Sequence, residues 1–322
     1  MDLVIESFDG ERRWLSNYAD IPADYDGVTY PTAEHAFAAA KTLDLAERKR
    51  IAGMPTPGDA KAAGQNVELR PEWDKRIRYE AMWQVLASKF SDPKLLRRLT
   101  STGDLLLVET NCWHDQHWGD CICPKHREMP GQNHLGRALM ALRALRREDR
   151  ADRWTRVGIT GHRDLGLDAE TWVRGELGRV MNKLRAEHDT AVLIDGMAMG
   201  ADVVAAEAAL GSGLRLWAYM PFPDQTARWP ATWIRRQEEI RSKASRVVVL
   251  GDRPASAGGR GRYVQLLHGR NRLIVRDCDA LIAVHDRSRT GGGTATTVDF
   301  AREVGLPIIT VDPGARGVSI SR

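Results

Sequence analysis

The stretch Pro31-Thr32-Ala33-Glu34-His35-Ala36-Phe37-Ala38-Ala39-Ala40-Lys41 places a carboxylate and an amine on an alanine-rich segment with helical character. Lys41 follows Glu34 by seven residues, which correspond to two helical turns. The two side chains are therefore predicted to share one face of a helix, separated by roughly 10 Å along its axis. An isolated pair of this kind is usually a solvated surface stripe. An acid and an amine on one rigid face can also flank a small polar substrate, and the rest of the first half favours that interpretation.

The composition is that of an ordinary soluble protein, long enough for two domains. The chain has 322 residues, of which 43% are hydrophobic and 28% charged. Apolar runs stay short of membrane-spanning length, and the first residues lack the features of a signal peptide. Four cysteines spread over this length do not indicate a disulfide framework, so a reducing, cytoplasmic location is expected. A formal net charge of +4 does not by itself indicate a nucleic-acid partner.

The hydrophobic pattern of the first half is mainly helical. Helices are predicted near 33–52, 58–64, 72–90, 93–101 and 134–147, with short strands at 3–8, 27–30 and 105–109. This combination predicts a mainly helical α+β domain. The polar segment 148–152 is a predicted linker, so the predicted domains are residues 1–150 and 151–322.

The pattern changes after the linker to an alternation of strands and helices. Strands are predicted at 157–160, 191–196, 215–219, 246–250, 280–284 and 307–311, with helices between them, the first near 168–187. Such alternation predicts an α/β domain with an open, Rossmann-like parallel sheet and helices on both faces. Ligand sites in folds of this kind lie at the carboxyl ends of the strands.

A series of polar and aromatic motifs accompanies the Glu34 segment along the first half. They are Trp14-Leu15-Ser16-Asn17-Tyr18, Asp59-Ala60-Lys61 with Gly64, Arg70-Pro71-Glu72-Trp73, Lys89-Phe90, Leu107-Val108-Glu109, Asp115, Trp118-Gly119-Asp120 and Gly131-Gln132-Asn133-His134-Leu135-Gly136. Their order and chemistry resemble the NADAR family over residues 1–147. The resemblance implies an N-glycosidase. Known members remove a ribosyl or ADP-ribosyl group from a nitrogen, either on riboflavin-pathway intermediates or on ADP-ribosylated guanine in DNA.

The resemblance also implies roles for individual residues. Cleaving a C1′–N bond develops positive charge on the sugar, and the departing base needs a proton. Carried over by position, Glu34 is the predicted general acid/base, and Lys41 would capture C1′ as a Schiff base or stabilise charge. Asp115 is predicted to bind ribose hydroxyls or to stabilise the cation. The predicted substrate-binding residues are Asn17, Lys61, Trp73, Glu109, Trp118 and Asn133.

Some of these assignments have structural alternatives. Trp73 and Trp118 would stack on a base or adenine, or they are ordinary core aromatics. Lys61 or Lys89 would replace Lys41 in catalysis, or only pair with carboxylates.

A dense group of cysteines and histidines surrounds Trp118. Its members are Cys112, His114, His117, Cys121, Cys123 and His126. Four of them would suffice for a tetrahedral zinc site, but the paired C-x-x-C spacing typical of such sites is missing. The implied hydrolysis needs no metal, so neither a metal nor a cofactor is predicted.

Three glycine-rich segments of the second half follow predicted strands or precede predicted helices. They are residues 158–163, residues 195–202 and residues 290–297. Glycine-rich turns at helix N-termini expose backbone N–H groups that bind phosphate. Together they resemble the SLOG superfamily over about 155–313, which is related to the LOG enzymes and to part of DNA-processing protein A. The resemblance implies a nucleotide or ADP-ribose ligand, bound by Gly161, Arg163, Gly196, Gly200, Gly291, Gly292, Gly293 and Thr294.

The second half departs from the enzymatic branch of this superfamily. LOG phosphoribohydrolases have a glutamate three residues after the Gly-Thr pair, where this chain has Thr297. Binding without cleavage is therefore expected there, with Arg272 and Asp279 as further candidates to line the pocket.

The whole sequence thus predicts an N-glycosidase joined to a nucleotide-binding domain. The expected substrate is ADP-ribosylated guanine in DNA. The alternatives are a small ribosylated nucleobase of riboflavin biosynthesis, or a non-catalytic sensor in which both domains bind nucleotide signals.

Overall fold

The computed structural model describes residues 3–147, 153–289 and 291–321. The chain forms two compact units, one built mainly from residues before the predicted linker and one mainly from residues after it. The linker itself, residues 148–152, lies outside the described residues, so the predicted domain boundary stays a prediction. Among the described helices, none combines the length and the apolar character needed to cross a membrane.

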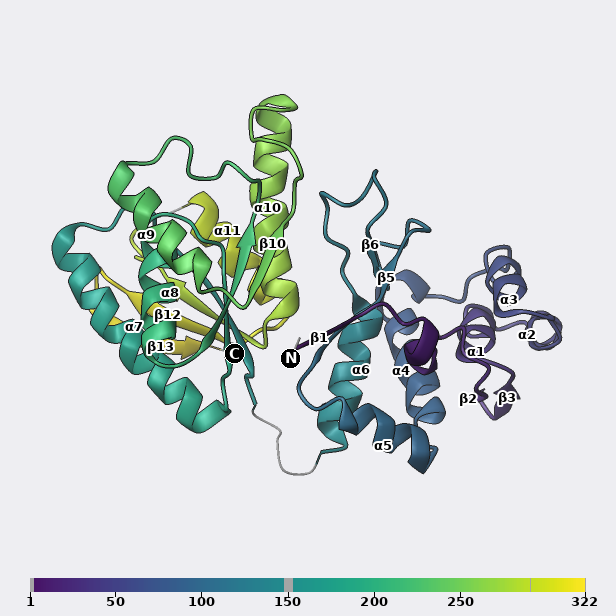
Figure 1. The fold of residues 1–322 in the computed structure, drawn as a ribbon. Helices are drawn as coiled ribbons and strands as arrows, with labels where there is room; N and C mark the ends of the chain where they lie inside the picture. The colour runs from purple at the N-terminus through teal and green to yellow at the C-terminus, as the bar shows by residue number, and fades with distance from the viewer. Residues whose placement is uncertain (1–2, 148–152, 290, 322) are drawn as a thin grey trace. The chain divides into compact units, whose positions relative to one another are not determined.

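The first unit is mainly helical and carries three small two-stranded sheets, which confirms the predicted α+β class (Figure 1). Its helices are α1 (Ala33–Ala39), α2 (Leu45–Ala52), α3 (Pro57–Ala63), α4 (Arg78–Lys89), α5 (Pro93–Ser101) and α6 (His134–Leu145), with a 3-10 segment η1 (Gly10–Leu15) and a π-helical segment η2 (Trp73–Ile77). Its strands pair as β1 (Val4–Glu6) with β4 (Leu106–Val108), β2 (Ala23–Tyr25) with β3 (Val28–Tyr30), and β5 (Thr110–Asn111) with β6 (Asp120–Cys121).

Helix α1 lies inside the core of this unit. All of its residues from Ala33 to Ala39 are buried. Thr32 fixes its start, because the Thr32 hydroxyl oxygen accepts a hydrogen bond from the backbone N–H of His35 at 3.3 Å. Helix α3 approaches α1 closely at its end, where a Cβ on Gly64 would lie only 2.8 Å from the Cβ of Ala38. The small residues of the two helices are therefore what lets α3 bring its side chains toward Glu34.

The prediction of one helix over 33–52 is wrong. α1 ends at Ala39, and α2 begins only after Asp44, whose carboxylate accepts hydrogen bonds from the backbone N–H groups of the first turn of α2. Lys41 lies in the turn between the helices, so it does not share a helical face with Glu34. Two interactions stabilise this turn, although the alanine-rich sequence favours a continuous helix. One is the cap at Asp44, and the other is the hydrogen bond from Arg48 Nε to the Thr42 carbonyl, at 2.8 Å.

The second unit contains a seven-stranded sheet in the order β10-β9-β8-β7-β11-β12-β13. The strands are β7 (Arg156–Gly161), β8 (Val192–Asp195), β9 (Arg215–Met220), β10 (Arg246–Val249), β11 (Ala280–Val284), β12 (Ile308–Asp312) and β13 (Gly317–Ser321). All neighbours are parallel except β13, which pairs antiparallel with β12 and was not predicted. The predicted Rossmann-like sheet is confirmed.

Five helices cover this sheet. They are α7 (Leu167–His188), α8 (Ala201–Gly211), α9 (Ala231–Ser242), α10 (Gly259–Asp277) and α11 (Gly292–Glu303). Helix α8 packs against α7 and α9, and α10 packs against α11 (Figure 1). The chain leaves β7 toward β8 on one side and returns to β11 on the other, so the strand order reverses at β7. Ligands of open α/β sheets bind at the carboxyl ends of the strands at such a reversal.

Candidate functional site

Glu34 is a nearly buried acid in the second position of α1. Only 9% of its surface is exposed, and its backbone N–H donates to the Asn17 carbonyl at 3.0 Å. Burial raises the pKa of Glu34 to about 7, while Lys61 and Lys41 oppose the rise and Asp115 adds to it. Glu34 therefore holds and releases a proton near neutral pH, as a general acid/base must.

Glu109 is a second acid of the same kind, although its sequence suggested only substrate binding. It follows β4, and its pKa is raised to about 8, first by burial and then by the negative charges of Asp115 and Glu34. Lys61 and Lys89 act in the opposite direction. Two carboxyl groups that titrate near neutral pH thus lie within electrostatic reach of each other. Glu109 is therefore an alternative to Glu34 as the proton donor, which the sequence analysis did not consider.

Two of the candidate lysines lie beside Glu34. Burial lowers the pKa of Lys41, the carboxylate of Glu34 counteracts this, and the charge of Lys61 adds to it. Lys61 projects from α3, and its Nζ lies 5.9 Å from the centroid of the Tyr18 ring. Lys41 thus reaches the acid from the turn after α1 rather than along the helix. An amine with a lowered pKa has a larger neutral, nucleophilic fraction.

Lys89 is the most buried of these lysines. Its side chain is almost inaccessible at the end of α4, and Nζ donates to the Ser16 carbonyl at 2.7 Å. Burial lowers the pKa of Lys89 to about 7, and Glu109 counteracts that shift. From the sequence, Lys89 was predicted only as an alternative to Lys41. The residue pattern of α4 does not reveal that the Lys89 side chain is buried.

Asp115 is held in place by its own loop. One carboxylate oxygen accepts hydrogen bonds from the backbone N–H groups of His117 and Trp118, at 3.0 and 2.9 Å. The Asn111 side chain donates to the Asp115 carbonyl at 2.8 Å and accepts from its backbone N–H at 3.2 Å. These bonds keep the Asp115 charge close enough to raise the pKa of both glutamates. Its proposed contact with the sugar stays a prediction.

The two predicted asparagines have different surroundings. The Asn133 side chain accepts from the backbone N–H of Glu109 at 3.1 Å and donates to the Leu107 carbonyl at 2.8 Å. Asn133 therefore positions Glu109, and its amide is already occupied. Asn17 donates to the sulfur of Met82 at 3.4 Å, whereas its buried Oδ1 has no hydrogen-bond partner within the described chain. That oxygen is an acceptor available to a ligand.

Trp73 and Trp118 both contact Phe37 of α1. The ring centroids lie 5.4 Å apart for Trp73 and 5.2 Å for Trp118. Trp73 is buried within the hydrophobic core, which agrees with its alternative interpretation as an ordinary core aromatic. Trp118 is only half-buried and keeps an accessible part of its ring.

Three residues around Trp118 were not predicted as site residues. Tyr79, His117 and His134 pack on one another, with the two histidine rings 4.6 Å apart. Burial and the neighbouring His117 lower the pKa of His134 to about 4, so this ring is neutral at physiological pH. Tyr18, whose pKa is raised by burial and by Glu34, was also missed. His134 and Tyr18 both lie inside motifs that were recognised, but motif order does not reveal ring contacts.

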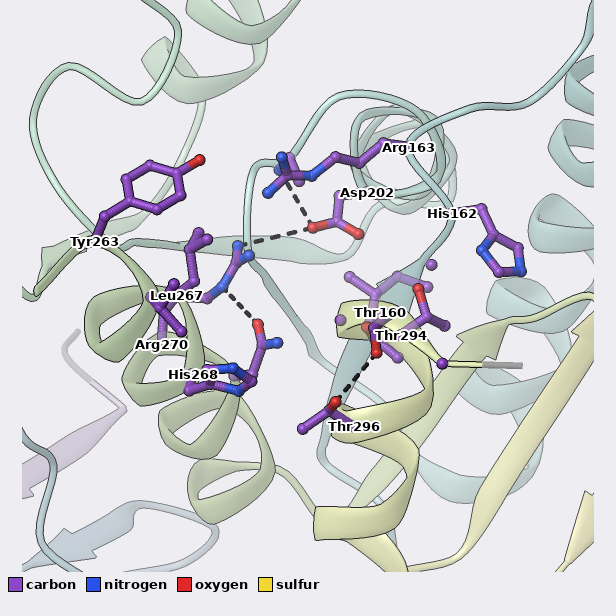
Figure 2. Close-up of a pocket in the computed structure, with 18 residues that line it drawn as sticks. Thr160, His162, Arg163, Asp202, Tyr263, Leu267, His268, Arg270, Thr294 and Thr296 are labelled. Carbon is purple, nitrogen blue, oxygen red and sulfur yellow. Dashed lines mark hydrogen bonds and ion pairs between the residues drawn. The ribbon is translucent and has the colours of Figure 1, made fainter. Parts of the chain in front are cut away.

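The second unit contains a cavity of about 580 Å³ at the carboxyl end of β7 and the start of α11 (Figure 2). Six of the predicted nucleotide-binding residues line it: Gly161, Arg163, Gly291, Gly292, Gly293 and Thr294. Gly196 and Gly200 are not among its lining residues. A Cβ on Gly200 would lie 2.4 Å from the Arg163 carbonyl oxygen, and φ there is +88°. Gly200 is therefore required where its turn closely approaches the backbone of Arg163, and its predicted contact with a nucleotide stays a prediction.

Buried charges form one wall of this cavity. Arg270 Nη1 lies 3.8 Å from the Asp202 carboxylate and also donates to the Gly196 carbonyl, while Nε donates to Asn271 at 2.8 Å. Figure 2 shows Arg163 and Arg270 both directed toward Asp202. Burial raises the pKa of Asp202, and Arg270 and Arg163 oppose the rise. Gly196 thus acts through its carbonyl, as a support for Arg270.

Thr297 occupies the position of the phosphoribohydrolase glutamate and is fully buried in α11. Its hydroxyl donates to the Gly293 carbonyl at 2.7 Å. The other two candidates for this pocket were wrong: the Arg272 guanidinium lies over the Phe300 ring at 4.7 Å, and Asp279 pairs with Arg156 at 2.8 Å. Neither is among the residues that line the cavity.

Comparison with known families agrees with both halves of this description. A family model described as NADAR domain matches residues 7–146, and one described as DNA recombination-mediator protein A matches residues 149–318. The N-glycosidase YbiA of Escherichia coli K12 is 37% identical over 132 residues, which are 40% of this chain and 78% of YbiA. The chain belongs to the NADAR family in its first half and to the DNA recombination-mediator protein A family in its second.

Further relatives concern the NADAR half. The chloroplastic riboflavin biosynthesis protein PYRR of Zea mays is 32% identical over 132 residues, covering 37% of this chain and 20% of PYRR. The NMR structure of E. coli YbiA shares 33% identity and covers 44% of this chain and 84% of its own, with a TM-score of 0.39. Through its named N-glycosidase relatives, the NADAR half has support for a general N-glycosidase role.

The raised pKa of Glu34 makes stability depend on pH. The folded-state pKa of about 7 exceeds the ordinary value of 4.5. Between these two pH values the folded state binds more protons than the unfolded state, so the free energy of unfolding falls as pH rises. The difference between the two pKa values corresponds to about 3 kcal/mol of unfolding free energy. Between about pH 5 and about pH 8, we expect wild type to lose up to that much more unfolding free energy than Glu34→Gln.

Urea denaturation of both proteins across this range measures the difference. The matched control is Glu68→Gln, an exposed glutamate of the same unit, which should keep the wild-type pH dependence. Parallel curves for wild type and Glu34→Gln would show that Glu34 ionises as an ordinary carboxyl.

Proposed function

We propose that the NADAR half hydrolyses the N-glycosidic bond of an ADP-ribosylated or ribosylated nitrogen, with ADP-ribosylated guanine in DNA as the preferred substrate. The observation that carries the proposal is the pair Glu34 and Glu109, whose pKa values of about 7 and 8 suit proton transfer at neutral pH. Near them, the partly buried Lys41 and the buried Lys89 supply positive charge or a nucleophile.

In the proposed reaction, protonated Glu34 gives its proton to the base nitrogen as the C1′–N bond breaks. The Asp115 carboxylate stabilises the positive charge that develops on the sugar. Water then adds to C1′, and the proton it loses returns to Glu34 or Glu109. In the covalent version, the neutral amine of Lys41 attacks C1′ as the C1′–N bond breaks and Glu34 protonates the departing nitrogen. The attached amine then loses a proton, the ring opens to a Schiff base, and water adds to the imine carbon and releases the sugar and the lysine amine. Both versions end with the unmodified base, which is free or still part of its DNA strand, and with the free sugar or ADP-ribose.

The choice of substrate rests on the second half of the chain. The N-terminus of α11, with three successive glycines, lines its cavity. Backbone N–H groups at a helix N-terminus favour a phosphate ligand, which supports the proposal. A chain that recognises phosphorylated ribose in one half is suited to an ADP-ribosyl substrate in the other. The similarity to PYRR favours the second candidate, a small ribosylated nucleobase of riboflavin biosynthesis.

Glu34→Gln is expected to lower turnover by roughly 10²–10⁴-fold, because the amide can neither give nor take the proton. The assay incubates wild type and variant with an oligonucleotide carrying ADP-ribosylated guanine and, separately, with a ribosylaminopyrimidine. Mass spectrometry follows ADP-ribose released from the oligonucleotide and free base released from the pyrimidine compound. Glu68→Gln should retain wild-type rates. Undiminished turnover by Glu34→Gln would assign the proton to another group, with Glu109 the next to replace. Tight binding of both compounds without turnover by wild type would support the sensor instead.

Borohydride added during turnover is expected to trap a covalent sugar adduct on Lys41. Reduction makes an imine permanent, and the lowered pKa of Lys41 favours its formation. Peptide mass spectrometry locates the adduct, and Lys41→Ala should prevent it. An adduct on Lys61 or Lys89 would show that another lysine is the nucleophile. Full activity of Lys41→Ala without any adduct would leave direct attack by water.

We further propose that the second half binds a phosphorylated nucleotide or ADP-ribose without hydrolysing it. The glycines at the start of α11 and the guanidinium of Arg163 supply groups for an anionic ligand around the cavity. Thr297 stands where a hydrolase would have its glutamate, and its hydroxyl is already bonded within the helix. These features support recognition and provide no carboxylate at that position for cleavage.

Calorimetry on full-length Glu34→Gln with ADP-ribose, NAD and AMP tests this second site. When Arg163→Ala is added to the Glu34→Gln protein, the affinity for the ligand that binds best should fall about tenfold or more, because a charged hydrogen bond is lost. Arg179→Ala, on the exposed face of α7, should leave affinity unchanged. Equal affinities in both arginine variants, or free base released from AMP, would contradict the proposal.

A further inference from the structure

Four metal-ligating side chains of the first half's cysteine and histidine group come together in the structure. Each of His114, Cys121, Cys123 and His126 offers one ligand atom, and these four atoms all lie within 4.8 Å of one another. Both cysteines are buried, His126 is partly buried and His114 is exposed. Sequence spacing alone did not predict a metal here, because the ligands are not arranged as paired C-x-x-C motifs.

The local course of the chain explains how this irregular spacing converges. Cys121 ends β6, and Cys123 follows it by two residues, so on extended backbone the two side chains point to the same side. Cys123 then begins a turn in which its carbonyl accepts hydrogen bonds from the backbone N–H groups of His126 and Arg127, both at 2.9 Å. In such a turn, residues three apart lie on one face. Three ligands therefore face one point within six residues of chain.

His114 completes the group from the preceding loop. Its backbone is left-handed, with φ of +70°, a conformation that few non-glycine residues adopt without a reason. All four ligands lie within residues 114–126, so the site is local to one continuous segment of chain.

The distances fit a tetrahedral ion. Bond lengths of about 2.3 Å to sulfur and 2.0–2.1 Å to nitrogen imply edges of roughly 3.3–3.8 Å between neighbouring ligand atoms. Cys123 Sγ and His126 Nδ1 lie 3.4 Å apart, which is within that range. The largest separation exceeds the range by about 1 Å, a movement that side-chain rotation can supply.

We propose that His114, Cys121, Cys123 and His126 bind one zinc ion. Two thiolates and two imidazoles are a donor set that zinc prefers in proteins, and four protein ligands make a closed, structural site. The ion would join the end of β6 to the loop that carries Asp115 and Trp118. Its role is to hold that loop, and the proposed hydrolysis does not pass through it.

Zinc analysis of the full-length protein, expressed with added zinc, tests the proposal. Plasma mass spectrometry should find about one zinc ion per chain. Cys123→Ser and His126→Ala should each lower the zinc content more than ~10-fold, because each removes a ligand. Cys112→Ser is the matched control, since this exposed cysteine belongs to the same loop but not to the four-residue group. It should retain the zinc.

A second measurement covers variants that fail to fold. Cobalt(II) added to metal-free wild type should produce thiolate-to-cobalt charge-transfer absorption and the visible bands of a tetrahedral site, and zinc should abolish both. A chelator should lower the melting temperature of wild type and of Cys112→Ser. Folded wild type that binds neither zinc nor cobalt in stoichiometric amount would overturn the proposal. So would a Cys121–Cys123 disulfide in freshly purified protein.

Discussion

The burial of α1 is the constraint on which the first site depends. A helix enclosed on all sides must be made of small residues wherever its neighbours approach, and the alanines of α1 together with Gly64 meet that condition. The same enclosure removes water from Glu34, which sits one residue inside the helix. Deprotonation of a carboxyl group without water is unfavourable unless positive charge lies nearby. Packing and proton chemistry are therefore set by one feature, because anything that loosened the helix would also restore water to the acid.

The charges around α1 show why enclosure makes a site for proton transfer. Burial raises the pKa of an acid and lowers that of an amine, so both shifts approach neutrality from opposite sides. Glu34 reaches about 7, Glu109 about 8 and Lys89 about 7. Groups with matched pKa values exchange protons with little change in free energy. An N-glycosidase needs this property, since the proton given to the departing base must be recovered from the attacking water.

Sequence patterns predicted the elements better than they predicted what surrounds them. Alternating apolar runs located the parallel strands, because buried strands of an open sheet must be apolar on both faces. The break after α1 was missed, since the cap at Asp44 is a local interaction that the alanine-rich pattern conceals. The burial of Lys89 could not be predicted from the sequence either, because its hydrogen-bond acceptor, the Ser16 carbonyl, lies 73 residues away along the chain. Asn133 was predicted to bind substrate, which stays a prediction, and its role as a support for Glu109 is visible only in its two hydrogen bonds to the backbone.

The two candidate sites differ in how their charges are used. Around Glu34, titratable groups are poised near neutrality and the Asn17 amide oxygen keeps an open acceptor. In the second cavity, the Arg270 guanidinium is bonded to Asn271 and to the Gly196 carbonyl, and it lies beside Asp202. Those bonds fix the cavity wall, and a fixed wall of charge and backbone N–H groups favours selective binding of an anion over proton transfer. The physical contrast between exchangeable protons in one unit and immobilised charges in the other therefore supports assigning cleavage to the NADAR half and recognition to the second half.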